Sequence, residues 1–93
     1  MTDFELAIIE EIKATLSEGI YSHNLTEIET YWLVGSMIIG YDLNPRLIDI
    51  PEHVKKTAIN LYKKYPVKDM EDLANILPHG KLVSLAKLKK EWT

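Results

Sequence analysis

The sequence of 93 residues contains no cysteine and no glycine-rich loop that matches a phosphate-binding pattern. Without cysteine, neither disulfides nor thiolate metal sites can stabilise the fold. The three histidines, His23, His53 and His79, lie far apart and at no recognised metal-ligand spacing. The sequence therefore predicts a protein without a metal ion and without a cofactor.

The sequence also lacks a long hydrophobic run. The apolar stretch at residues 31–39 falls short of the roughly 20 residues that a membrane-spanning helix needs. The first residues, MTDFELAIIEEIK, carry acidic residues where a signal peptide would carry lysine or arginine. We therefore expect a cytoplasmic protein with no membrane segment.

Basic residues are nearly absent from the first half of the chain. Residues 1–45 contain one lysine against eight acidic residues, whereas residues 46–93 contain ten basic residues against six acidic ones. The halves thus carry net charges of −7 and +4. This asymmetry indicates either a basic surface for an acidic partner or two groups of helices that attract each other. We favour the second explanation.

Apolar residues recur at helical spacing, and no segment alternates convincingly with the period of a β-strand. A first helix is predicted from a Thr2-x-x-Glu5 capping box to about Gly19. A second, apolar at nearly every position of residues 28–39, starts after either Asn24 or Thr26. Further helices are predicted after Pro51, after Asp69 and from Lys81 towards Trp92. The expected fold is an all-α single domain, residues 1–93, with four to five helices.

Two residues of the second predicted helix raise the question of a binding site. Gly35 costs about 1 kcal/mol relative to alanine inside a helix, which indicates that another helix approaches closely there. Trp32 lies within the same apolar run, so we predict that it belongs to the core. We interpret both residues as packing features rather than as a site.

Catalysis has no support in the sequence. The serines lie in no turn motif that would activate a nucleophile. The acidic pairs Glu10–Glu11 and Glu27–Glu29 are interpreted as solvated helix faces, because a carboxylate pair that hydrolyses sugars would need a cleft. We therefore predict that the protein is not an enzyme.

The C-terminal third has the pattern of a helix-turn-helix: DMEDLANIL, then PHG, then KLVSLAKLKKEW. The candidate nucleic-acid-binding residues are the lysines of the last segment, Lys81, Lys87, Lys89 and Lys90. That segment lacks the arginine, asparagine and glutamine residues that read base edges, so its lysines would bind phosphates without sequence preference. A helical hairpin with a solvated lysine face is the alternative interpretation.

The stretch HNLTEIETYWLVGSMI resembles part of the helical N-terminal domain that precedes a PD-(D/E)XK-type nuclease in a family of bacterial proteins. The resemblance covers residues 6–40 and rests on Asn24, Tyr31, Trp32, Val34, Gly35 and Ile38. After Gly40 the arginine-rich stretch and the nuclease of that family are absent. The resemblance implies a helical module for assembly or nucleic-acid association, of phage or mobile-element origin, and it supplies no catalytic residue.

Two functions from different classes remain open. The favoured one is a small protein-binding module, an adaptor or inhibitor, which uses the acidic first half or its aromatic residues. The alternative is a DNA-binding or other nucleic-acid-associated regulatory protein that uses the basic C-terminal hairpin. The pI near 5.5 favours the first. A homodimer is a further expectation, because a second copy could cover the apolar second helix.

Overall fold

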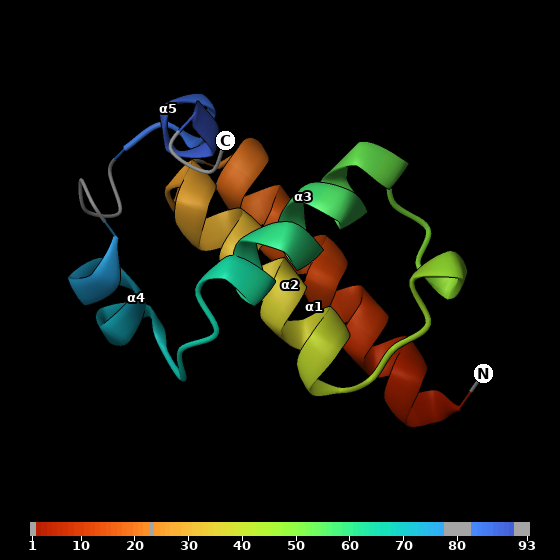
Figure 1. Ribbon diagram of the computed structural model, residues 1–93. Helices are drawn as coiled ribbons and strands as arrows, with labels where there is room; N and C mark the ends of the chain where they lie inside the picture. The colour runs from red at the N-terminus through yellow and green to blue at the C-terminus, as the bar shows by residue number, and fades with distance from the viewer. Residues whose placement is uncertain (1, 23, 78–82, 91–93) are drawn as a thin grey trace.

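Five α-helices and one short 3-10 helix form the part of the chain that the structure describes, residues 2–22, 24–77 and 83–90 (Figure 1). In this computed structural model the elements are α1 (Asp3–Ile20), α2 (Glu27–Gly40), η1 (Pro45–Leu47), α3 (Glu52–Lys64), α4 (Met70–Ile76) and α5 (Leu85–Lys90). These residues include no β-strand. The prediction of an all-α fold is confirmed.

The first two helices begin where their side chains cap them. The Glu5 amide donates to Thr2 Oγ1, and the Thr2 amide donates to Glu5 Oε1, both over 3.1 Å. Thr26 and Glu29 form the same reciprocal pair at the start of α2, over 3.0 and 3.1 Å. Each pair satisfies amides that a helix end leaves without partners. Of the two predicted starts of α2, Thr26 is therefore correct and Asn24 is not.

The connection before α3 is held by a lysine whose role the sequence did not indicate. Lys55 is only 7% exposed. Its Nζ donates to the carbonyl oxygens of Pro45 (2.9 Å) and Ile48 (3.3 Å) and lies 3.2 Å from Glu52 Oε2. Three oxygen partners compensate for the burial of the ammonium group. Lys55 therefore fixes η1 against α3 and adds no charge to a binding surface.

α2 lies between α1 and α3 and is the central helix of the fold (Figure 1). Four of its apolar side chains are at most 3% exposed: Ile28, Trp32, Val34 and Ile38. The chain itself thus supplies the burial that the sequence suggested a second copy would supply. The homodimer stays a prediction, but the need to cover the apolar side chains of α2 no longer supports it.

Two glycines allow these helices to approach each other. A Cβ atom at Gly35 would overlap the carbonyl oxygen of Ala58 on α3 and would lie 2.9 Å from Tyr62 Cβ. The predicted close approach at Gly35 is therefore confirmed. A Cβ atom at Gly19, on α1, would overlap the side chain of Thr30 on α2. Each neighbour of α2 is thus placed by a glycine at the contact.

The buried side chains form two clusters that meet along α2. The first joins α1, α2, the η1 connection and α3, and contains Ile9, Ile12, Leu16, Val34, Ile38, Leu43, Ile48, Val54 and Ala58. The second joins α2 and α3 to α4 and α5, and contains Ile28, Trp32, Leu61, Leu73, Leu77, Leu85 and Leu88. Trp32 Nε1 donates to the carbonyl oxygen of Tyr65 over 2.9 Å. Trp32 is therefore a core residue, as predicted.

Candidate functional site

The described part of α5 presents the predicted nucleic-acid-binding lysines, the exposed Lys87, Lys89 and Lys90. The other side of this helix buries Leu85 and Leu88 in the second cluster. Lys87 and Lys90 are three residues apart and therefore share one side of the helix. Lys81, the fourth candidate, lies outside the described residues.

The start of α5 differs from the prediction. Val83 and Ser84 are not helical, so the helix begins at Leu85 rather than at Lys81. Two acceptors determine this start: Ser84 Oγ accepts from the Lys87 amide (3.2 Å), and Glu27 Oε1, on α2, accepts from the Leu85 amide (2.8 Å). A carboxylate near a helix N-terminus is favourable because it meets the positive end of the helix dipole.

Glu27 and Glu29 are therefore not the solvated pair that the sequence suggested. Glu29 is 7% exposed and is engaged in capping α2. Glu27 is exposed but joins the two halves of the chain through the Leu85 amide. An acidic residue of the first half thus contacts the backbone of α5 in the second half.

Between the end of α4 at Ile76 and the start of α5 at Leu85, the structure describes Leu77, Val83 and Ser84, and none of these three is helical. A helix-turn-helix joins its helices through about three or four residues. The predicted PHG turn, residues 78–80, lies outside the described residues. α4 and the described α5 are seven and six residues long, and both bury leucines in the second cluster.

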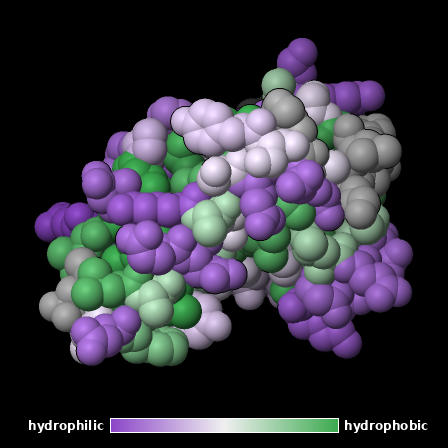
Figure 2. All heavy atoms as spheres, turned by 180° about the vertical axis from the view of Figure 1, so that it is seen from behind, coloured by the Kyte–Doolittle hydropathy of each residue, from purple (hydrophilic) through white to green (hydrophobic). Residues whose placement is uncertain are grey.

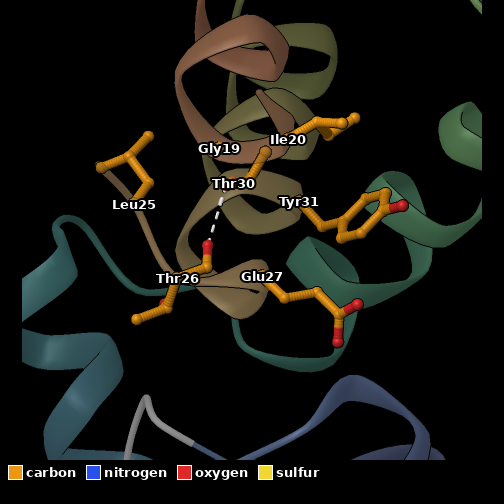
Figure 3. Close-up of a pocket in the computed structure, with 7 residues that line it drawn as sticks. All are labelled: Gly19, Ile20, Leu25, Thr26, Glu27, Thr30 and Tyr31. Atoms are coloured by element: carbon orange, nitrogen blue, oxygen red, sulfur yellow. Dashed lines mark hydrogen bonds between the residues drawn. The ribbon is translucent and has the colours of Figure 1, made fainter. Parts of the chain in front are cut away.

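A cavity of about 430 Å³ lies where α1 ends and α2 begins (Figure 3). Its lining residues are Gly19, Ile20, Leu25, Thr26, Glu27, Thr30 and Tyr31. Figure 3 shows Leu25 on one side of α2 and Glu27 with Tyr31 on the other, so these residues surround the helix start. Sequence reasoning missed this cavity, because its lining depends on how α1 and α2 pack.

The polar groups of this cavity already serve the fold. Thr30 Oγ1 donates to the carbonyl oxygen of Thr26 over 2.8 Å, and Glu27 holds the start of α5. Burial, and secondarily the charge of Glu27, raises the pKa of Tyr31, so its phenol is neutral near pH 7. The seven lining residues include no lysine, histidine or serine that could act with these groups as a nucleophile or a general base.

Exposed aromatic side chains form a different candidate surface at the start of α1, at the end of the helix opposite the cavity. Phe4 is 59% exposed and Tyr41 is 49% exposed. Their rings contact each other edge to face, with centroids 5.5 Å apart and planes at 72°. We call these two residues the aromatic pair. The sequence did not indicate this contact, since Phe4 continues the apolar spacing of Ile9, Ile12 and Leu16, which are buried.

The backbone after α2 holds Tyr41 in place. Its amide donates to the Met37 carbonyl (3.1 Å), and the Leu43 amide donates to the Ile38 carbonyl (2.9 Å). Asp42, between them, has a φ of 52°, a left-handed conformation that aspartate adopts more readily than most residues. Leu43 is 7% exposed and anchors this turn in the first cluster. The aromatic pair is therefore displayed on a fixed backbone.

Figure 2 shows the wider surroundings of this end from behind. Hydrophobic atoms gather at the lower left, the end of the molecule that carries the N terminus, and hydrophilic atoms border them. η1, which carries the exposed Leu47 and Arg46, lies towards the same end in Figure 1. Exposed apolar surface with a polar border is typical of a site of protein interaction.

The described residues contain neither a cluster of metal ligands nor a helix that could span a membrane. Nowhere in residues 2–22, 24–77 and 83–90 do three histidine or carboxylate side chains lie close enough to hold a metal ion. His53 is exposed on α3, while His23 and His79 lie outside these ranges. In the same part of the chain, every helix is too short or too polar to cross a bilayer.

Comparisons of the chain with protein-family models, with curated proteins and with solved structures find no match. The resemblance of residues 6–40 to a nuclease-associated helical domain therefore stays a prediction. Function has to be inferred from the surfaces themselves.

Proposed function

We propose that this chain is a small, non-catalytic cytoplasmic protein-binding module, an adaptor or inhibitor of phage or mobile-element origin. Its contact surface is centred on Phe4 and Tyr41. The observation that supports this proposal is that two aromatic rings pack on each other and yet keep about half of their surface exposed. Aromatic residues are enriched at the energetic centres of protein interfaces.

The surroundings of the aromatic pair support the same proposal. Leu6, in the same first turn of α1 as Phe4, is 47% exposed, and Leu47 on η1 is 48% exposed. α1 packs against α2 on one side, and its other side carries the exposed Glu10, Glu11 and Glu18. The acidic first half thus combines apolar contact area with charge that limits nonspecific association.

Differential capture tests this proposal. The immobilised wild-type protein is compared with Phe4→Ser/Tyr41→Ser in a nuclease-treated lysate of the cells that produce it. The matched control is Tyr21→Ser/Ile76→Ser, which removes two exposed hydrophobic side chains elsewhere on the surface. We expect a protein that wild type and control retain and the aromatic-pair variant loses. Equal capture by all three proteins would contradict the proposal.

A nucleic-acid-associated function is the second candidate, because Lys87, Lys89 and Lys90 are exposed together on α5. Phosphate contacts release counterions, so binding through these lysines would weaken steeply as salt concentration rises. The test is titration of mixed-sequence duplex and single-stranded DNA with wild type and with a variant in which Lys81, Lys87 and Lys90 are glutamine. Salt-sensitive binding that this variant loses would replace our proposal, whereas no binding at low salt would exclude the second candidate.

A further inference from the structure

Three acidic residues are sequence neighbours of the aromatic pair. Asp3 and Glu5 are the sequence neighbours of Phe4, and Asp42 follows Tyr41. Asp3 and Asp42 are exposed, and Glu5 is half-buried. The hydrogen bond from the Thr2 backbone, and then that from its side chain, lowers the pKa of Glu5, which is therefore ionised at neutral pH. The sequence neighbours of Phe4 and Tyr41 thus carry three negative charges. The positive amino terminus, which also lowers the pKa of Glu5, offsets part of this charge, and Arg46 is an exposed cation on η1.

This charge pattern restricts what can cover the pair. A second copy of the chain related by twofold symmetry would bring the same three carboxylates towards each other, and like charges at an interface are costly. The phosphates of nucleic acids and anionic lipids would meet the same repulsion. The complementary occupant is a positively charged protein segment.

The rings themselves favour arginine as the source of that charge. Because the two rings meet edge to face, with centroids 5.5 Å apart, substantial ring surface stays exposed. A guanidinium group can stack on an aromatic face and donate two hydrogen bonds to a carboxylate, whereas an ammonium group offers only a point charge. Two exposed aromatic residues whose sequence neighbours include Asp3 and Asp42 therefore suit arginine better than lysine.

We infer that the segment bound at the aromatic pair is an arginine-bearing apolar peptide segment of another protein. Its apolar side chain contacts Phe4 and Tyr41, and its arginines pair with the carboxylates of Asp3, Glu5 and Asp42. This inference rests on the proposed protein-binding function and adds the chemistry of the partner.

The probe that tests the inference is a short, fluorescein-labelled peptide of leucine and arginine. Peptides of equal length with lysine or glutamate in place of arginine are its comparisons, and fluorescence anisotropy measures binding. We expect wild-type protein to bind the arginine peptide more tightly than the lysine peptide and not to bind the glutamate peptide. Phe4→Ala/Tyr41→Ala should raise the Kd about tenfold or more, the scale of an aromatic hot spot.

A pair of charge variants separates local from general attraction. Asp3→Asn/Asp42→Asn removes two charges beside the rings, whereas Glu11→Gln/Glu18→Gln removes two exposed charges elsewhere on α1. The first should raise the Kd about fivefold, the scale of two exposed ion pairs, and the second should change it less than about twofold. Circular dichroism of each variant verifies that it is folded before its Kd is interpreted.

The outcomes distinguish the two levels of the proposal. In one set of outcomes, Phe4→Ala/Tyr41→Ala weakens binding but the two charge variants have equal effects, or the lysine peptide binds as tightly as the arginine peptide. Either result would show that the partner is not an arginine-bearing segment, and the aromatic pair would remain the binding surface. If the aromatic variant leaves the Kd unchanged, the proposed surface is also wrong. A wild-type dimer in light scattering that Phe4→Ala/Tyr41→Ala dissociates would make a second copy the occupant and would likewise overturn the inference.

Discussion

Helices α1, α2 and α3 contain 18, 14 and 13 residues, whereas α4 and the described α5 contain seven and six. Isolated helices shorter than about 12 to 15 residues are marginal in water. Only α1 exceeds this range, α2 and α3 fall within it, and α4 and α5 lie well below it. The two short helices depend on leucines buried in the second cluster, Leu73, Leu77, Leu85 and Leu88.

The two regions differ also in what fixes their boundaries. α1 and α2 start at capping boxes formed within four consecutive residues. α5 starts at Leu85, whose amide is bound by Glu27, a residue 58 positions away. α4 also has a local cap, Asp69, but both short helices bury their leucines in the second cluster, so the second region forms on a surface that α2 and α3 provide. Trp32 is part of that surface.

The largest loss of stability is expected from Trp32→Ala, because this residue belongs to the surface on which the short helices pack. The substitution removes the indole from the cluster in which α4 and α5 pack, and it removes the indole donor to the Tyr65 carbonyl, which keeps its hydrogen bond from the Val67 amide. We expect the free energy of unfolding to fall by about 3 to 5 kcal/mol. Chemical denaturation followed by circular dichroism measures the loss. Trp32→Phe, which keeps much of the packing and lacks the donor, should cost less, and a wild-type transition for Trp32→Ala would contradict the core role.

The second-largest loss of stability is expected from a substitution at the contact between α2 and α3. Gly35→Ala places a methyl group against the Ala58 carbonyl, which cannot move without shifting α3. Alanine favours a helix over glycine by about 1 kcal/mol, but overpacking should outweigh this and give a net destabilisation of about 1 to 3 kcal/mol.

Gly40→Ala is the matched control for that experiment. A Cβ atom at Gly40 meets no atom within 4 Å, so the same change of residue should be neutral or slightly stabilising. Thermal unfolding of both variants measures the difference. Equal melting temperatures for the two would mean that α2 and α3 do not meet at Gly35 as closely as the structure indicates.

The sequence predicted the features that depend on local patterns. The cap at Asp69, the start of α1 and the role of Gly35 follow from residue types within a few positions of one another, and each is confirmed. The start of α5 was missed because Glu27 reaches it across the fold.

The candidate surface was less predictable than the fold. Phe4 continues the apolar periodicity of α1, and only the end of α2 shows that it contacts Tyr41 and not the core. Lys55 likewise counts as a surface charge in the sequence, although the connection at η1 buries it. Contacts with other segments of the chain determine whether each of these two side chains is exposed or buried. Hydropathy patterns do not encode such contacts.

The smallest loss of stability is expected from a substitution at the start of α5. This substitution tests most directly whether the short helices and the long helices open separately. Ser84→Ala removes the hydroxyl that accepts from the Lys87 amide and should cost about 1 kcal/mol, as the loss of an N-cap does. If α5 opens separately from α2, hydrogen exchange of the Lys87 and Leu88 amides should accelerate about fivefold, since this free energy corresponds to roughly that factor. The amides of α2 should keep their wild-type protection.

Ser17→Ala, an exposed serine on α1, is the control for this substitution and should leave α5 exchange unchanged. Glu27→Gln, in turn, keeps an oxygen acceptor for the Leu85 amide and removes only the charge, so its effect on α5 should be smaller than that of Ser84→Ala. Because both groups act on the first turn of one short helix, the double variant should deviate from additivity. If Ser84→Ala accelerated exchange in α2 by the same factor, the molecule would unfold as one cooperative unit. The two regions would then differ in how they form but not in how stable they are.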